Sequence, residues 1–215
     1  MLTPKCVDYL HEALRFQADP AHQHEVSSCR TQPRTHFHVK PRLLAVGGLT
    51  CSQESPLVEN NLCQFYNEDT SRWETLTKMP PSVGVMYSVC CVGRSLLLTG
   101  GMKEGVALNQ CWLYDLATKK WEAMPPLITA RFYHRSVSMG NSVYVVGGRG
   151  DGDNNVVGGR GVGDNNVLAS VECLSLNRRQ WTAMPDLPQA VYAATVVTYG
   201  NSVFVFGGGM RRTWR

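Results

Sequence analysis

The chain has 215 residues, 43% hydrophobic and 18% charged, a composition that favours a folded domain over a disordered chain. Its formal net charge of +4 is modest, and the basic residues are scattered apart from Arg211, Arg212 and Arg215, so no nucleic-acid-binding surface is indicated. Since the sequence contains neither a signal peptide nor an apolar run of about 18 residues, we expect a cytoplasmic protein that does not bind a membrane.

The first predicted element is a helix within residues 1–20, with an apolar stripe formed by Val7, Leu10 and Leu14. Residues 21–41 are predicted to be a polar linker. The linker contains two His-x-His pairs, which we interpret as solvated because no cysteine spacing of a zinc site accompanies them (His22, His24, His36 and His38).

Residues 42–210 contain an internal repeat, a short apolar strand that ends in two glycines. It occurs four times, at residues 43–48, 96–101, 143–148 and 203–208. A tryptophan follows each of the first three glycine pairs, and it stands 27, 26 and 26 residues before the next pair (Trp73, Trp121 and Trp181). The periods of 53, 47 and 60 residues lie in the range of β-propeller blades.

The longest period contains a tandem duplication of 11 residues, since residues 146–156 are followed by a near copy at 157–167. Without one copy, the period falls to 49 residues and matches the others. We therefore predict one long exposed loop, rich in glycine and asparagine, over residues 149–167.

Each period has the composition of four strands. The glycine-ended strand is continuously apolar, which predicts burial on both faces. Turn-forming stretches at residues 67–72, 115–120 and 175–180 predict hairpins. A Met-Pro pair after each tryptophan closes the outer strand, because proline cannot donate to a central ladder.

The eight cysteines predict neither a metal site nor a disulfide framework. Cys63, Cys90, Cys111 and Cys173 occupy repeat positions where other repeats have apolar residues, so we expect them to pack as small hydrophobes. The other four have no Cys-x-x-Cys spacing (Cys6, Cys29, Cys51 and Cys91). His134 stands on a predicted strand, where we expect a structural hydrogen bond.

These features resemble the kelch repeat. The glycine pair, Tyr114-Asp115, the tryptophan and Arg131–His134 before Gly140 all match that repeat over residues 42–210. Arg131 occurs in one repeat alone, since Val83 and Val191 stand at the same distance from their tryptophans. The resemblance implies an all-β fold, an incomplete kelch β-propeller of four-stranded antiparallel blades preceded by a short helix.

The N-terminal helix and residues 28–34 are similar to the end of a BACK domain and its junction to kelch repeats in proteins of the BTB-BACK-kelch type. Such proteins carry a BTB domain and about six repeats, within the usual range of propeller blades. This sequence holds about three and a half blades, so we expect a fragment or an alternative isoform with residues 211–215 as a tail.

The resemblance implies a substrate-recognition module of a cullin-based ubiquitin ligase adaptor, with an indirect cullin link through a longer parent protein. A protein substrate or peptide degron would bind the rim loops at residues 53–60, 103–108, 131–133 and 149–164. Arg131 and Arg149 would pair with acidic groups, because guanidinium offers a bidentate fork. The candidate residues are Glu54, Asn60, Lys103, Glu104, Arg131, Tyr133, Arg149, Asp151, Arg160 and Asp164.

Other functions find less support. Asp151–Asn155 begins like a calcium loop but lacks its glycine and glutamate, and Gly147–Gly150 precedes no nucleotide-binding helix. Arg149-Gly-Asp151 matches the integrin tripeptide, which an intracellular protein would not use. We expect no enzyme activity, metal or cofactor, because no catalytic motif is present and Tyr133 with His134 is too small a set for a copper oxidase. A second hypothesis is a cytoskeletal or scaffolding protein that binds actin or another structural partner. An upstream BTB exon in the parent transcript would argue against this hypothesis.

Overall fold

The computed structural model describes residues 8, 11, 43–52, 55–151 and 166–210. The chain divides into residues 1–42 and 43–215, and the fold below is that of the second unit. Of the predicted N-terminal helix, Asp8 and His11 are described and helical, and the rest lies outside the described residues. The described part of the chain contains no helix with the length and hydropathy of a membrane span.

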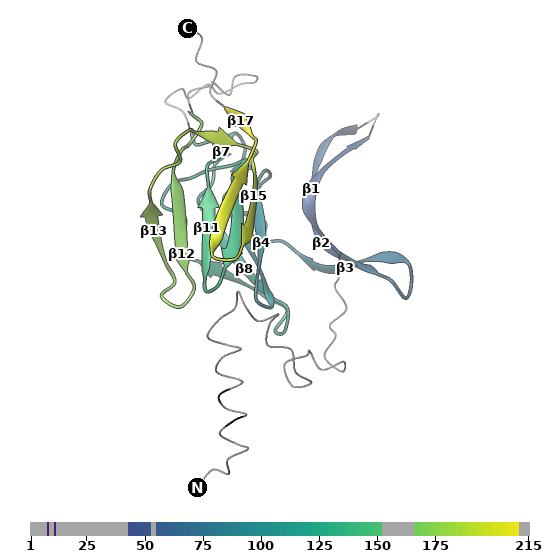
Figure 1. Ribbon diagram of the computed structural model, residues 1–215. Coiled ribbons are helices and arrows are strands. Elements are labelled where there is room, and N and C mark those ends of the chain that lie inside the picture. The colour runs from purple at the N-terminus through teal and green to yellow at the C-terminus, as the bar shows by residue number, and fades with distance from the viewer. Residues whose placement is uncertain (1–7, 9–10, 12–42, 53–54, 152–165, 211–215) are drawn as a thin grey trace. The chain divides into compact units, whose positions relative to one another are not determined.

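The second unit consists of antiparallel sheets that follow one another along the chain (Figure 1). The first sheet has the order β1 (Leu44–Ser52), β2 (Ser55–Asn67) and β3 (Arg72–Lys78). The second has the order β4 (Ser88–Val92), β5 (Ser95–Thr99), β8 (Cys111–Asp115) and β9 (Lys120–Met124).

The third sheet repeats the second with β10 (Arg135–Met139), β11 (Ser142–Val146), β12 (Val171–Ser175) and β13 (Gln180–Met184). The fourth pairs β15 (Thr195–Tyr199) with β16 (Ser202–Phe206). Two small ladders join β6 (Met102–Lys103) to β7 (Val106–Ala107) and β14 (Val191–Tyr192) to β17 (Gly209–Met210). The second and third sheets thus confirm the prediction of four strands per period.

The predicted turns form the hairpins β2–β3, β8–β9 and β12–β13. In the second sheet, Oδ1 of Asp115 accepts hydrogen bonds from the backbone N–H groups of Ala117 at 2.7 Å and Thr118 at 2.9 Å. These bonds stabilise the carboxylate and lower the pKa of Asp115. In the other two hairpins, Asn67 and Ser175 occupy the position of Asp115, and each accepts a hydrogen bond from a backbone N–H group of the turn.

Neighbouring sheets pack face to face through repeated contacts. The first strands of successive sheets lie side by side, β4 against β10 and β10 against β15. Trp121 Nε1–H donates to the carbonyl of Lys78 at 2.8 Å, and Trp181 Nε1–H donates to the carbonyl of Pro125 at 2.8 Å. The regular tryptophan spacing therefore has a structural cause, because each of these indoles ties its sheet to the one before it.

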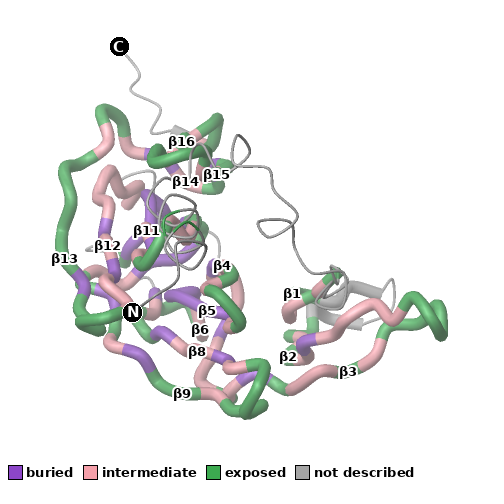
Figure 2. Tube along the Cα trace, turned by 60° about the horizontal axis from the view of Figure 1, so that its bottom comes forward, coloured by how far each residue is buried: buried purple, intermediate pink, exposed green. Residues whose placement is uncertain are grey.

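The core lies between the sheets, and it explains where the burial prediction succeeds (Figure 2). In β5, Leu96–Thr99 are all at most 2% exposed, as predicted for a strand covered on both faces. The same prediction is wrong for β16, where Phe204 is 41% and Phe206 is 56% exposed, and for the first repeat, where Leu43 is 65% exposed. No described sheet covers that face of β16, so its alternate residues remain open to solvent.

Of the four cysteines predicted to pack as small hydrophobes, Cys63 and Cys111 are buried in the core, whereas Cys90 and Cys173 are half-buried. Burial raises the pKa of Cys63 and Cys90 to about 11 and of Cys111 to about 12. The protonated thiols thus behave as small hydrophobes. Cys91 is exposed, and the remaining cysteines of the sequence lie outside the part that we describe or have no described side chain.

Candidate functional site

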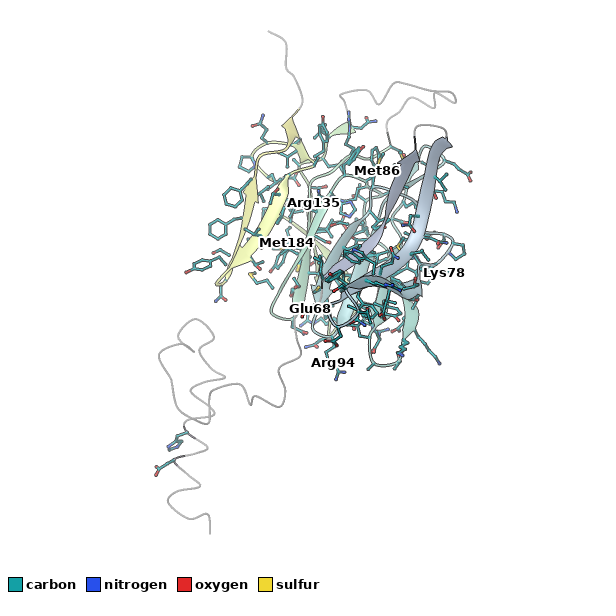
Figure 3. The ribbon with its side chains drawn as sticks, turned by 90° about the vertical axis from the view of Figure 1, so that its right-hand side faces the viewer. Glu68, Lys78, Met86, Arg94, Arg135 and Met184 are labelled. Atoms are coloured by element: carbon teal, nitrogen blue, oxygen red, sulfur yellow. The ribbon has the colours of Figure 1, made fainter. Side chains whose placement is uncertain are left out.

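The loops that follow the glycine pairs gather at one end of the sheets, the loop end, where β7 and β17 lie (Figure 1). Figure 3 places Met86 toward this end, whereas Glu68 and Arg94, from hairpin turns, lie at the opposite one. The loop end is where segments of different sheets meet through hydrogen bonds outside the regular ladders. It is therefore the part of the fold that can present side chains from several repeats to one partner.

The second glycine of each pair brings the loops close to the next sheet. The N–H of Gly101 donates to the carbonyl of Arg131 at 2.8 Å, and the N–H of Gly148 donates to the carbonyl of Val191 at 2.8 Å. Gly148 has φ +100°, and a Cβ there would lie 2.8 Å from both His134 Cβ and the Phe132 carbonyl oxygen. The glycine is required by conformation and by space.

A row of backbone hydrogen bonds connects the second, third and fourth sheets through residues just before their first strands. Tyr133 N–H donates to the Met86 carbonyl at 3.0 Å, and Ala193 N–H donates to the Tyr133 carbonyl at 2.8 Å. All three residues have positive φ, between +51° and +59°. Because L-residues rarely adopt this conformation, the surrounding contacts must hold it in place. Tyr133 thereby occupies a fixed position at the loop end.

Tyr133 belongs to an aromatic cluster with Phe132 and Tyr192. The ring centroids of Tyr133 lie 5.5 Å from Phe132 and 6.3 Å from Tyr192. The guanidinium of Arg149 lies 4.6 Å from the centroid of the Tyr192 ring, in a cation–π arrangement. Tyr133 is 36% exposed and is accessible to a partner. Arg149 is buried at 8% exposure, which corrects the prediction that it lies in an exposed loop and pairs with an acidic partner group, because its guanidinium packs on Tyr192.

Two charged residues attach neighbouring loops to each other. Oδ1 of Asp151 accepts a hydrogen bond from the Ala107 N–H at 2.7 Å, which joins the loop of the third sheet to that of the second. Nζ of Lys103 donates to the carbonyl of Pro81 at 2.7 Å. Glu104 lies beside them in an exposed turn with φ +52°. The structure thus brings Lys103, Glu104 and Asp151 to the same end as Tyr133 and Arg149.

Arg131 requires a correction, because its side chain is fully buried and does not reach the surface. Its Nη2 forms an ion pair with Oε1 of Glu172 at 2.5 Å, and its Nη1 donates to the carbonyl oxygens of Gly147 at 2.9 Å and Ser170 at 3.1 Å. Glu172 also accepts hydrogen bonds from the N–H groups of Ile128 and Thr129. Arg131 therefore crosslinks strands inside the protein instead of pairing with an acidic partner group.

The repeat alignment at Arg131 also changes. Val85 exchanges backbone hydrogen bonds with Met102 as Phe132 does with Arg149, so the structural equivalent of Arg131 in the second sheet is Gly84, not Val83. The segment from Met79 to Met86 is one residue longer than the matching segment from Leu127 to Tyr133. Because of this extra residue, residues at the same distance from Trp73 and Trp121 are not structurally equivalent in this segment.

His134 has the predicted structural hydrogen bond. Its Nε2 lies 2.9 Å from Oγ1 of Thr99, and the ring is completely buried. Burial and the neighbouring Arg131 charge lower the pKa of His134 to about 3. The imidazole is therefore neutral at physiological pH and acts as a crosslink to β5.

Of the remaining candidates, only Asn60 lies within the described residues. Oδ1 of Asn60 accepts a hydrogen bond from the Leu62 N–H at 2.9 Å, a local contact within β2. Glu54, Arg160 and Asp164, with most of the duplicated loop, lie outside the described residues, as do the four linker histidines. Within the described ranges, no group of three His, Cys, Asp or Glu side chains could hold a metal ion.

Two residues with a role in or beside the site, Glu172 and Tyr192, were not predicted from the sequence. Glu172 is a lone carboxylate in an otherwise apolar strand segment, at the register position of Trp112 in the second sheet. A charge at such a position is a signal of a buried ion pair. Tyr192 has no such signal, since its role depends on contacts with residues far along the chain.

Comparison with known proteins agrees with this geometry. The Kelch motif family matches residues 84–128 and 130–188. Kelch-like protein 21 of Danio rerio is 32% identical over 147 residues, covering 68% of this chain and 23% of that protein. Kelch-like protein 25 of Xenopus laevis is 31% identical over 185 residues, covering 85% of this chain and 29% of that protein.

The chain thus spans about a quarter of the length of these curated relatives. The solved "Structure of YjhT" superimposes with a TM-score of 0.59 at 17% identity, over 71% of this chain and 46% of that one, which supports the propeller fold. Sequence motifs, sheet order and relatives agree, and the chain belongs to the kelch-repeat family.

Proposed function

We propose that the loop end is a protein-binding surface and that the chain is a kelch-type interaction module. The observation that carries this proposal is the exposed ring of Tyr133, which Tyr192 and the buried Arg149 support at the same end as the Lys103–Glu104 turn. Exposed aromatic side chains on a fixed scaffold are typical of binding surfaces. Asp151 supports the surface by fixing one loop to the next.

The finer proposal is that this surface recognises a protein substrate or peptide degron for a cullin-based ubiquitin ligase in the cytoplasm. It is supported by similarity to Kelch-like proteins 21 and 25, and any link to a cullin would be indirect, through a longer protein. The turn carries one cation and one carboxylate in adjacent positions, the half-buried Lys103 and the exposed Glu104. We propose that a bound segment would place an apolar or aromatic residue on Tyr133 and polar groups over this turn.

The test is quantitative affinity capture with the full chain, comparing wild type with Tyr133→Ala and Lys103→Ala. The matched control is Leu116→Ala, because Leu116 is 38% exposed but lies in a hairpin turn at the opposite end. A specific partner should lose at least ten-fold in recovery with either loop-end variant and be unchanged in the control. Equal recovery with all variants would contradict the placement, and an enriched actin fraction would favour the cytoskeletal alternative.

A further inference from the structure

The end of the sheets opposite the loop end carries an excess of positive charge. The hairpin turn of residues 115–120 in the second sheet and that of residues 175–180 in the third each contain two adjacent cations. The turn between β4 and β5 contains one more, which Figure 3 labels at this end. All five side chains are exposed, and we name them the basic strip: Arg94, Lys119, Lys120, Arg178 and Arg179.

Contacts between the three turns show that the strip is continuous. Arg179 of the third sheet forms a bidentate ion pair with Glu122 of the second, with Nη1–Oε1 at 2.6 Å and Nη2–Oε2 at 3.1 Å. Lys120 stands two residues before Glu122 on the same face of β9, because alternate residues of a strand point the same way. The carbonyl of Arg94 accepts a hydrogen bond from the Leu116 N–H at 3.3 Å, which holds the β4–β5 turn beside the β8–β9 turn.

The carboxylates within the strip do not neutralise it. Glu122 is occupied by the ion pair just described, and Asp115 accepts two N–H groups of its own turn. Lys119, Lys120 and Arg178 form no ion pair with a carboxylate in the described part of the chain. Five cations and two carboxylates give the strip a formal net charge of +3, whereas the whole chain has +4. The charge excess of the chain is therefore concentrated on this surface.

Two of these cations stand where the turn itself favours a different residue. Lys119 has φ +56° and Arg179 has φ +50°, and Ser71 occupies the equivalent position of the first hairpin with φ +52°. Glycine and asparagine adopt this left-handed conformation more easily than long side chains do. Turn stability therefore does not explain the choice of a cation at both positions, and backbone outliers of this kind cluster at functional sites.

We propose that the basic strip binds an acidic segment of a partner protein, as a second surface separate from the loop end. Carboxylates of such a segment would accept bidentate hydrogen bonds from the Arg178 guanidinium, because its planar fork matches their geometry. Lys119 and Lys120 would contribute as point charges beside it.

A short acidic peptide fits this surface better than a long polyanion. Glu68, in the hairpin turn of the first sheet, lies at the same end as Arg94 (Figure 3). A nucleic acid that continued past the strip toward the first sheet would meet this carboxylate, and like charges repel. A peptide with a few carboxylates can remain within the turns of the second and third sheets.

Fluorescence anisotropy of an end-labelled decaglutamate peptide with the full chain tests the proposal. We expect saturable binding at low ionic strength that weakens as salt is added, since charges are screened over about 8 Å at physiological ionic strength. Arg178→Ala and Lys119→Asn should each raise the dissociation constant about three-fold, and the double variant about ten-fold, as for exposed ion pairs. Asparagine at position 119 removes the charge but keeps the left-handed turn.

The matched control is Arg135→Ala, which removes one exposed cation at the other end of the sheets. Arg135 is the first residue of β10 and pairs in register with Val146, directly before a glycine pair. This variant should bind the peptide like wild type. Lys119→Asn should keep the circular dichroism spectrum and a Tm at least equal to that of wild type, so that weaker binding reports the lost charge.

Three results would overturn the proposal. The first is the absence of saturable binding by wild type at low salt. The second is an equal loss of affinity in Arg135→Ala and the strip variants, because binding would then follow the net charge of the chain. The third is tighter binding of a labelled oligothymidylate of the same length, which would assign the strip to nucleic acid instead of an acidic peptide.

Discussion

The Arg131–Glu172 pair lies inside the protein, although the sequence predicts Arg131 at the binding surface. Both side chains are at most 2% exposed, and they join β12 to the segment before β10. We expect Arg131→Ala to reduce the free energy of unfolding by about 3–5 kcal/mol, because it leaves the Glu172 carboxylate buried without its cation. Urea denaturation would measure the loss.

A double-mutant cycle identifies the cause. Arg131→Met with Glu172→Gln should cost less than the sum of the two single changes, since the second change removes the stranded charge. The exposed pair of Arg179 and Glu122 is the control, and Arg179→Ala should leave the urea midpoint nearly unchanged. Additive costs for Arg131 and Glu172 would exclude the ion pair as the source of stability.

His134 gives the protein a pH-dependent contribution to stability. Its pKa is lowered from 6.5 to about 3 on folding, so between these values the unfolded chain binds a proton that the folded chain excludes. Stability from this residue is therefore present above pH 6.5 and is lost as pH falls toward 3, by at most about 1.4 kcal/mol per pH unit.

His134→Gln should flatten this dependence while keeping a partner for Thr99. The measurement is the free energy of unfolding at several pH values between 4 and 7 for wild type and variant. The difference between the two curves isolates His134 from carboxylates that titrate in the same range. Parallel curves would mean that the buried ring does not control the slope.

At the scale of the element, the glycine pair is the unit that connects one sheet to the next. Gly148 and Gly140 both have positive φ, at +100° and +57°, but only Gly148 lacks space for a Cβ. We expect Gly140→Ala to cost about 1 kcal/mol for the conformation alone. Gly148→Ala should cost clearly more, because the new methyl would contact the His134 Cβ and the Phe132 carbonyl.

Thermal unfolding of the two glycine variants provides the measurement. Gly148→Ala should have the lower Tm, and its circular dichroism should show loss of sheet before the control variant melts. Equal Tm values would mean that the loop can move away from the added methyl group. The close approach between Gly148 and the segment before β10 would then be unnecessary for folding.

The sequence predicts these elements well because their causes are local. Apolar runs, turn residues and the glycine pairs identify the strands and hairpins of the second and third sheets. Contacts between distant residues could not be predicted in this way: Arg131 and Glu172 are 41 residues apart. One extra residue between Met79 and Met86 was enough to shift the expected equivalence of Arg131.

At the scale of the whole unit, stability should be highest in the second and third sheets. β5 and β11 are buried between neighbours, whereas β15 and β16 alternate between intermediate and exposed residues. Amide hydrogens in regions with few buried contacts exchange through local opening of low free energy. In hydrogen–deuterium exchange at low protein concentration, β5 and β11 should therefore exchange slowest and β15–β16 faster. Equal exchange rates in β5 and β16 would contradict this gradient, because they would mean that the partly exposed residues of β15 and β16 do not lower the free energy of local opening.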